Sequence, residues 1–230
     1  MGKLGYGYGS EVHLLRWLGR HRTELGKRAE AALGLKNLEW LDFGFDGSNP
    51  IPDAELKGLC FLKDNPAYEK VLEAYRVGEI SWPQRGQQMN WDAIGVANGT
   101  YVLCEAKAHI EEIEKVYSPG ESESVRQRIR AFDFAKRKVG AKADADWMHG
   151  FYQMANRLYV LALLSEFGIK AKLLNIYFCG DKFPGAKYVC PIDASGWQGI
   201  IDEEYASLGI DRTLPYIRDN VCELFLPVIA

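Results

Sequence analysis

The sequence predicts an α/β or α+β fold, with helices flanking one mixed central sheet in a single domain spanning residues 1–230. Three features predict it. Two apolar strands are joined by Asn98-Gly99, a long amphipathic helix follows them, and a further apolar strand comes after that helix. Hydrophobic residues make up 47% of the chain and charged residues 26%, which is typical of a globular protein.

The spacing of apolar side chains places the other elements. In the first half of the chain we expect a helix at 10–34 capped by Ser10, a short strand at 38–45, helical pieces at 53–76, and strands at 89–97 and 100–108. Charged helices at 110–142 should follow, and then a helix at 146–167 with Gly168 as its C-cap glycine. The remaining expected elements are a buried strand at 172–179, a strand at 187–192, a helix near 197–207 and an irregular C-terminus.

The Asn98-Gly99 turn fixes the register of the predicted hairpin, because both residues tolerate the positive φ of a two-residue type I′ turn. Residue i then opposes residue 197 − i, which places Asp92 across from Glu105. Side chains alternate along a strand, so Glu105 and Lys107 share one face with Tyr101 and Leu103. The other face is apolar, formed by Val102, Cys104, Ala106 and Ala108.

Two carboxylates on directly opposed strand positions repel each other unless a cation lies between them. Magnesium fits this role because it takes oxygen ligands and commonly uses one or two carboxylates with water and phosphate, and Mn²⁺ would substitute for it. The carbonyl of Ala106 could be a third ligand, and Lys107 could orient or deprotonate a water. The alternative is a surface salt bridge that joins Lys107 to Asp92 and Glu105.

Asp92, twelve intervening residues and then Glu105-Ala106-Lys107 resemble the D-x(n)-E-x-K signature of the PD-(D/E)XK nuclease superfamily. The resemblance implies a restriction endonuclease-like core of helix, hairpin, crossover helix and strand, an order that 10–34, 89–108, 146–167 and 172–179 follow. It also implies a Mg²⁺-dependent nuclease acting on DNA, with RNA as the other nucleic acid. Asp92 and Glu105 would bind metal, Lys107 would be catalytic, and Glu11 on the first helix would support the metal.

The chain departs from the family pattern in two places. Trp91 precedes Asp92 where many members have proline. Some repair nucleases carry Q-x-x-x-Y on the following helix, whereas here Gln153 is followed by Arg157, with Tyr159 out of register. The segment PDAELK at 52–57 also contains the family letters, but no hairpin fits between Asp53 and Glu55, and we interpret it as the start of a helix.

Basic residues cluster within a chain whose net charge is −3. The predicted nucleic-acid-binding residues on one run are Arg126, Arg128, Arg130, Lys136, Arg137 and Lys138. A second cluster contains Arg16, Arg20, Arg22, Lys27 and Arg28. Each cluster is equally well explained as a solvated helix face. Gln153 and His109 are candidate supporting residues of the active site, although a solvated helix face and an exposed strand end explain them too.

The remaining features bear on location and partners. GYGYGS precedes the first helix without a P-loop or dinucleotide fingerprint, and in a nuclease Tyr6 and Tyr8 would line a DNA groove. Five cysteines without C-x-x-C spacing favour a reducing, cytoplasmic location. No apolar stretch approaches the roughly 20 residues that span a bilayer, so we expect no membrane partner. Many such nucleases pair as homodimers.

Two hypotheses for the function therefore follow from the sequence. The first is an active Mg²⁺-dependent nuclease. The second is a catalytically silent domain of the same fold that binds nucleic acid or a protein partner. An unrelated α/β enzyme would be favoured if Asp92 and Glu105 lay too far apart to share one cation.

Overall fold

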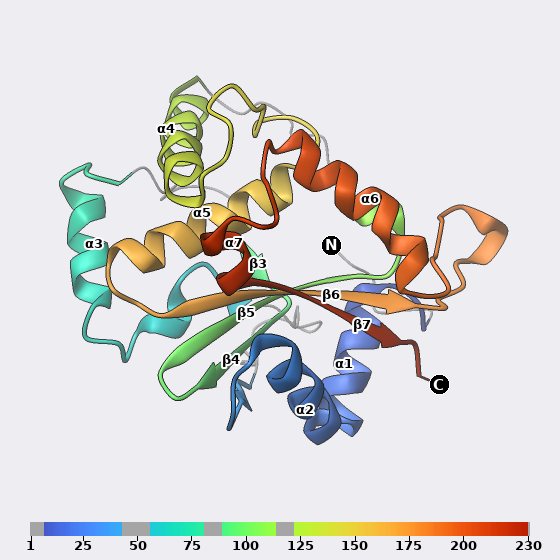
Figure 1. Ribbon diagram of the computed structural model, residues 1–230. Coiled ribbons are helices and arrows are strands. Elements are labelled where there is room, and N and C mark those ends of the chain that lie inside the picture. The colour runs from blue at the N-terminus through green and yellow to red at the C-terminus, as the bar shows by residue number, and fades with distance from the viewer. Residues whose placement is uncertain (1–6, 43–55, 81–88, 114–121, 230) are drawn as a thin grey trace.

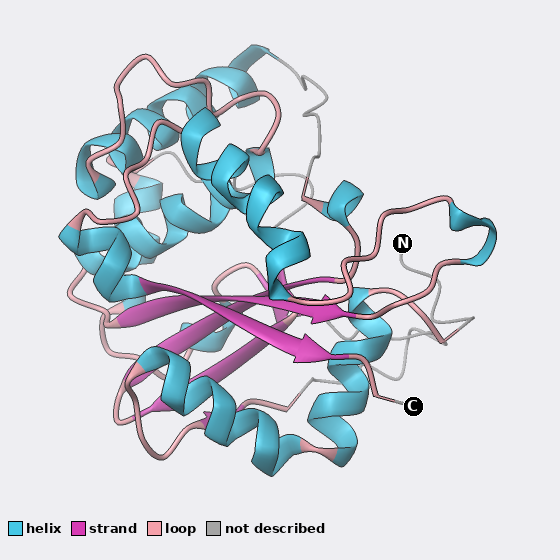
Figure 2. Ribbon diagram, turned by 45° about the vertical axis from the view of Figure 1, so that its right-hand side comes forward, coloured by secondary structure: helices cyan, strands magenta, loops and turns pink. Residues whose placement is uncertain are grey.

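The computed structural model describes residues 7–42, 56–80, 89–113 and 122–229. Within these residues a five-stranded mixed sheet, ordered β1-β4-β5-β6-β7, lies between helices on both faces (Figures 1 and 2). The predicted class, a mixed central sheet with flanking helices, is therefore confirmed.

The predicted hairpin forms the antiparallel half of this sheet. β4 (Ala93–Ala97) pairs with β5 (Thr100–Lys107) in the predicted register, from Ala97 opposite Thr100 to Ala93 opposite Cys104. The turn residues Asn98 and Gly99 have φ values of 49° and 76°, as a type I′ turn requires. β1 (Glu39–Trp40) extends the sheet beyond β4; of the strand predicted at 38–45, residues 38–42 are described and only 39–40 form a strand.

The parallel half contains β6 (Ala171–Cys179) beside β5 and β7 (Val221–Pro227) beside β6. β6 confirms the buried strand predicted at 172–179. The predicted irregular C-terminus was wrong, because residues 215–220 form α7 (Pro215–Asn220) and β7 follows it directly. The predicted strand at 187–192 was also wrong, since that segment is a loop after the 3-10 turn η3 (Pro184–Ala186).

One face of the sheet is covered by α1 (Ser10–Arg20) and α2 (Arg22–Leu33), which pack on the small apolar face of β5. The sequence predicted one helix here. The chain breaks instead at His21, whose φ of −125° and ψ of 26° lie outside the helical range. Ser10 is the first helical residue and not the N-cap, which is Gly9 with a φ of 93°.

The other face is covered by α5 (Tyr152–Glu166), which connects β5 to β6, with α6 (Ala194–Ser207) and α4 (Ser122–Val139) around it. α5 ends before Gly168, which has the positive φ of 70° predicted for a C-cap glycine. α5 begins six residues later than predicted, because the Asp146 carboxylate accepts the backbone N–H groups of Met148 and His149 in a local turn. Gly150 then takes a positive φ of 73°.

A second, two-stranded sheet corrects the expectation for PDAELK. Leu56–Lys57 form β2, which pairs with β3 (Asn90–Trp91), so the described end of that segment is a strand and not a helix. The 3-10 turn η1 (Cys60–Leu62) and α3 (Tyr68–Arg76) follow it, and η2 (Ile110–Glu112) follows β5. Predictions for Tyr6, Asp53, Glu55, the turn at 46–50 and the break at 118–120 fall outside the described residues.

Among the described helices, none combines the length and the apolar character that crossing a membrane requires.

Candidate active site

Glu105 and Lys107 lie near the end of β5 and face α5, as the alternation of the strand predicts. Glu105 is only 5% exposed and Lys107 8%, so both charged groups are removed from bulk water. Burial of a charge is strongly unfavourable unless it is paired and hydrogen-bonded. The partners of these two groups therefore decide what the site can do.

Asp92 occupies a bend between β3 and β4, beside Glu105. Its N–H donates to the carbonyl of Cys104 at 3.2 Å, and its Oδ2 accepts the N–H of Ala106 at 2.6 Å. Asp92 thus contacts the backbone on both sides of Glu105. The regular ladder ends one residue earlier than predicted, at Ala93, yet Asp92 still reaches the backbone next to Glu105 and feels the charge of that carboxylate.

Both carboxylate oxygens of Glu105 are hydrogen-bonded. Lys107 and Gln153 donate to Oε1. Arg157 donates to Oε2 through Nε at 2.8 Å and through one terminal nitrogen at 2.5 Å. Gln153 also accepts from the ammonium group of Lys107 at 2.9 Å, so its amide links the lysine to the carboxylate. Gln153, predicted as a supporting residue, is therefore part of the cluster.

Arg157 is the member of the cluster whose role the sequence analysis missed. It is 5% exposed, donates to the carbonyl of Asn90 at 2.6 Å, and its guanidinium carbon lies 4.6 Å from the centroid of the Trp91 ring. Trp91 is in turn held by a 2.9 Å hydrogen bond to the carbonyl of Gly58. An arginine among the buried positions of an apolar helix is a sequence signal, because arginine is almost never buried without a partner.

The four charges perturb one another strongly. Burial raises the pKa of Asp92 to about 7, and the neighbouring charge of Glu105 contributes to this shift. Burial would also raise the pKa of Glu105, but Arg157 and Lys107 outweigh it and lower the pKa to about 2. Lys107 is buried as well, yet Glu105 and Asp92 hold its pKa above the ordinary value, so it stays protonated. At neutral pH Asp92 is therefore partly protonated, whereas Glu105, Lys107 and Arg157 are charged and ion-paired.

A second polar group follows the end of β5. His109 lies between two carboxylates, with Nδ1 3.3 Å from Glu111 and Nε2 3.2 Å from Glu112. Glu112 also accepts the N–H of Ala108 at 2.6 Å and the hydroxyl of Ser10 at 3.2 Å. The start of α1, where Glu11 lies, is thereby attached to the segment that follows Lys107.

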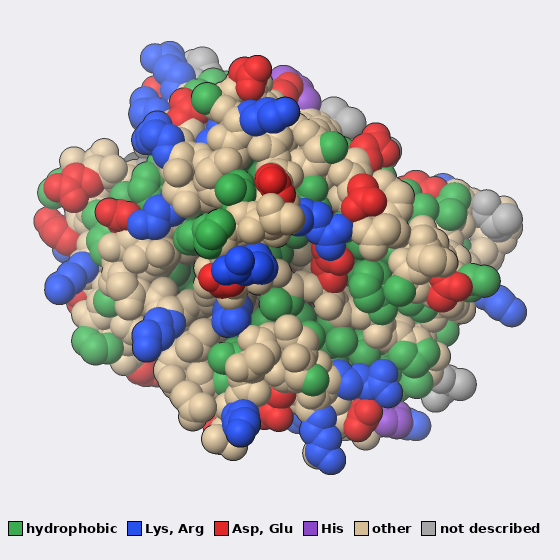
Figure 3. All heavy atoms as spheres, in the orientation of Figure 1, with side chains coloured by type: hydrophobic (Ala, Val, Ile, Leu, Met, Phe, Trp, Pro, Cys, Tyr) green, Lys and Arg blue, Asp and Glu red, His purple; other side chains and the backbone are tan. Residues whose placement is uncertain are grey.

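The basic residues of α4 gather on the side of that helix away from the sheet (Figure 3). Most of them have acidic neighbours: Arg126 and Arg130 approach Glu123 at 3.8 and 3.5 Å, Lys136 approaches Asp133 at 3.9 Å and Lys138 approaches Glu166 at 3.0 Å. Arg128 is closer to the candidate site, since its guanidinium lies 6.0 Å from the ring of Tyr152, the residue before Gln153. Arg137 is exposed.

Comparison with protein-family models, with curated proteins and with solved structures finds no match. The chemistry of the site must therefore be argued from its own groups. Among the described residues, no set of three or more His, Cys, Asp or Glu side chains is placed to hold a metal ion. Asp92 and Glu105 would form a two-carboxylate site, which suits Mg²⁺ because this ion usually keeps several waters and is bound by one or two carboxylates.

The pKa of Asp92 gives a first prediction. Mg²⁺ needs the ionised carboxylate, so its affinity should rise about tenfold per pH unit below pH 7 and level off above it. Calorimetric titrations with Mg²⁺ between pH 5.5 and 8.5 measure this affinity. A Mg²⁺ affinity that is flat across this pH range would contradict the assignment of Asp92.

The same pKa affects the stability of the protein without metal. The folded state has the higher Asp92 pKa, so this residue's contribution to stability should fall as the pH rises through 7.

Proposed function

We propose that this protein is a Mg²⁺-dependent nuclease that hydrolyses phosphodiester bonds of DNA, with RNA as the other nucleic-acid substrate to be assayed. Asp92, Glu105 and Lys107 form the proposed active site. One observation carries the proposal: Asp92, which is partly exposed, lies beside the buried Glu105 and has a pKa near 7 despite the nearby charges of Lys107 and Arg157. A divalent cation between the two carboxylates would favour the ionised form of Asp92.

Each residue of the proposed active site has a distinct proposed role. The Asp92 and Glu105 carboxylates would bind the cation, with the Ala106 carbonyl as a further oxygen ligand, and Glu11 would support it from α1. The bound metal, Mg²⁺ or Mn²⁺, would lower the pKa of a water and neutralise phosphate charge. Lys107 would orient that water and stabilise the negative charge that develops on the phosphate. Gln153 holds the Lys107 ammonium in place.

The arrangement of elements supports the nuclease reading. α1 and α2 cover one face of the sheet, the β4–β5 hairpin carries the acidic residues and the lysine, and α5 crosses the other face to reach the parallel strand β6. This is the order of the core that the PD-(D/E)XK resemblance implies. For the nucleic acid, Arg128 is the best placed of the predicted basic residues, because its guanidinium lies 6.0 Å from the ring of Tyr152, the residue before Gln153.

A second candidate function is favoured because both carboxylate oxygens of Glu105 already have hydrogen-bond donors within the chain. Lys107, Gln153 and Arg157 together satisfy both of its oxygens, which is how a structural ion-pair cluster would look. On this alternative the chain is a catalytically silent nuclease-like domain that binds nucleic acid or a protein partner. The two functions differ in one measurable property, because only the first requires a divalent cation to displace Lys107 from Glu105.

The deciding experiment compares the wild-type chain with Asp92→Asn. Asparagine keeps an oxygen that can accept the Ala106 N–H but cannot ionise, so the fold should persist while metal binding fails. We expect Mg²⁺-dependent cleavage of plasmid and branched DNA by the wild type and by the exposed control Asp144→Asn, with a loss of at least about 100-fold in Asp92→Asn. Equal cleavage by wild type and Asp92→Asn would refute the nuclease proposal.

We also propose a cytoplasmic location. All five cysteines are free thiols in the structure, and Cys104 is fully buried in the core that α1 and α2 cover. Free thiols are retained where glutathione and thioredoxin keep them reduced.

A further inference from the structure

Residues 180–193 form a loop that leaves the end of β6, projects from the body of the molecule and returns to the start of α6 (Figure 2). At its base the N–H of Gly180 donates to the carbonyl of Pro191 at 2.8 Å. Along its length the N–H of Ile110 donates to the carbonyl of Val189 at 2.9 Å. Backbone hydrogen bonds therefore fix the 180–193 loop and attach it to the segment that follows Lys107.

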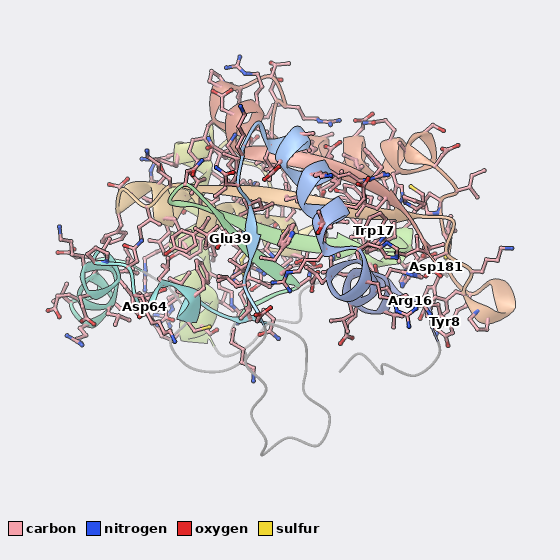
Figure 4. All side chains as sticks on the ribbon, turned by 90° about the horizontal axis from the view of Figure 1, so that it is seen from below. Tyr8, Arg16, Trp17, Glu39, Asp64 and Asp181 are labelled. Atoms are coloured by element: carbon pink, nitrogen blue, oxygen red, sulfur yellow. The ribbon has the colours of Figure 1, made fainter. Side chains whose placement is uncertain are left out.

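The 180–193 loop carries an aromatic cluster at this attachment. The Tyr188 ring stacks on His109 with centroids 4.3 Å apart and planes 17° apart. Phe183 stands edge-on to Tyr188 at 4.4 Å, and Tyr8 lies 4.2 Å from Phe183. Figure 4 shows Tyr8 beside Asp181, at the base of the loop. Phe183 and Tyr188 are both partly exposed, so the cluster reaches solvent.

The charge around the rings is arranged with the basic groups outward. Lys182 and Lys187 are exposed, and the Lys187 ammonium lies 4.9 Å from the centroid of the Tyr188 ring. Of the nearby acids, Asp181 is buried and accepts the N–H of Gly9 at 2.8 Å, whereas the exposed Glu111 is engaged by the N–H of Val189 at 3.1 Å and the exposed Asp193 accepts the N–H of Gly196 at 3.1 Å.

Exposed apolar side chains complete this surface. Val189 is 57% exposed and Ile192 is 82% exposed. Two exposed apolar side chains indicate an interaction surface only together with the rings and basic groups beside them.

We propose that the 180–193 loop binds single-stranded nucleic acid, with unpaired bases stacking on the partly exposed rings of Phe183 and Tyr188 and with Lys182 and Lys187 contacting phosphates. His109 already covers one stacking position on Tyr188, so a base there would replace the Lys187 ammonium, which moves to a phosphate. Aromatic rings combined with basic groups are the usual means of gripping a single strand, and every base offers a face to stack. In a duplex those faces are already covered by neighbouring bases. This inference rests on the proposed nuclease function and deepens it: His109 is two residues from Lys107, so the loop would select substrates with a single-stranded end or flap.

Binding is measured without cleavage, by fluorescence anisotropy of a labelled oligothymidylate and of a matched duplex, with the full chain in EDTA. We expect the wild type to prefer the single strand. Tyr188→Leu and Phe183→Leu should each weaken its binding by about fivefold or more, the effect of losing one stacked base. Tyr188→Phe keeps the ring and should bind as the wild type does. The control Tyr68→Leu, on α3 at the opposite end of the molecule, should also bind normally.

Lys187→Gln provides a second test that keeps every ring of the aromatic cluster and removes only the exposed ammonium beside Tyr188. It should weaken single-strand binding and reduce the slope of log affinity against log salt by about 0.7, the value for one phosphate contact. Wild-type affinity in both Tyr188→Leu and Lys187→Gln, or a preference of the wild type for duplex, would overturn the inference. Because EDTA suppresses cleavage, a failure of the nuclease proposal appears only in the Mg²⁺ assay and is distinguishable.

Discussion

Lys107→Met is expected to lower the single-turnover rate of DNA cleavage by about 10²- to 10⁴-fold, the range for loss of a group that positions or activates the attacking water. The fold should survive. Glu105 keeps both hydrogen bonds from Arg157, and the lost positive charge can be offset by protonation of Asp92, whose pKa is already near 7. Cleavage of a labelled duplex at saturating Mg²⁺ measures the rate.

Measuring Mg²⁺ affinity in Lys107→Met shows whether a loss of cleavage comes from a missing catalytic lysine or from a damaged metal site. Lys107 competes with a cation for Oε1 of Glu105, so Lys107→Met should bind Mg²⁺ at least as tightly as the wild type while failing to cleave. Lys172→Met is the matched control. Its lysine lies on the neighbouring strand β6 and bonds the carbonyl of Leu33, away from the site. A Lys107→Met rate within about fivefold of wild type would favour the structural salt bridge over a catalytic lysine.

The sequence predicted the positions of Glu105 and Lys107 because they depend only on neighbouring residues of the chain. The Asn98-Gly99 turn sets the register over a few residues, and alternation along β5 then fixes the face on which Glu105 and Lys107 lie. The same local reasoning was incomplete at Asp92, where the regular ladder has ended and the side chain instead accepts the backbone N–H of Ala106 on β5. The adjacency of the two carboxylates was nevertheless predictable.

The rest of the site depends on contacts between distant segments, which periodicity does not encode. Arg157 meets Glu105 across 52 positions of sequence, and its guanidinium rests on Trp91. β2 likewise pairs with β3 although its two residues also fit a helical pattern. β7 escaped prediction because its strand character comes from pairing with β6, and its alternating exposure is weak. Tertiary contacts decide such short segments.

The charge balance of the cluster explains why two cations are buried where the family signature requires one. Asp92 and Glu105 carry up to two negative charges, and Lys107 with Arg157 supplies two positive ones. If a divalent ion binds, Arg157 can remain on Oε2 of Glu105 while Lys107 leaves Oε1 for the substrate. Arg157 is then a positioning residue that fixes the Glu105 carboxylate, and its removal should affect stability before it affects chemistry.

Arg157→Met is expected to lower the free energy of unfolding by about 3–5 kcal/mol, the effect of removing one partner of a buried ion pair. Oε2 of Glu105 and the carbonyl of Asn90 would lose their donors. Urea denaturation at pH 7 measures the change. The control is Arg218→Met, whose solvent-exposed pair with Asp219 should change the free energy of unfolding far less.

The pH dependence identifies Glu105 as the group that Arg157 supports. In the wild type the Glu105 pKa is lowered to about 2, so its stabilising contribution is complete above the unfolded-state pKa and disappears as the pH falls toward 2. Without Arg157 the pKa of Glu105 should rise, and the destabilisation should therefore be larger at pH 7 than at pH 3. Glu105→Gln in the Arg157→Met background should recover part of the loss, because it removes the unpaired charge. A destabilisation of Arg157→Met that is equal at both pH values would show that Arg157 acts through packing on Trp91 and not through Glu105.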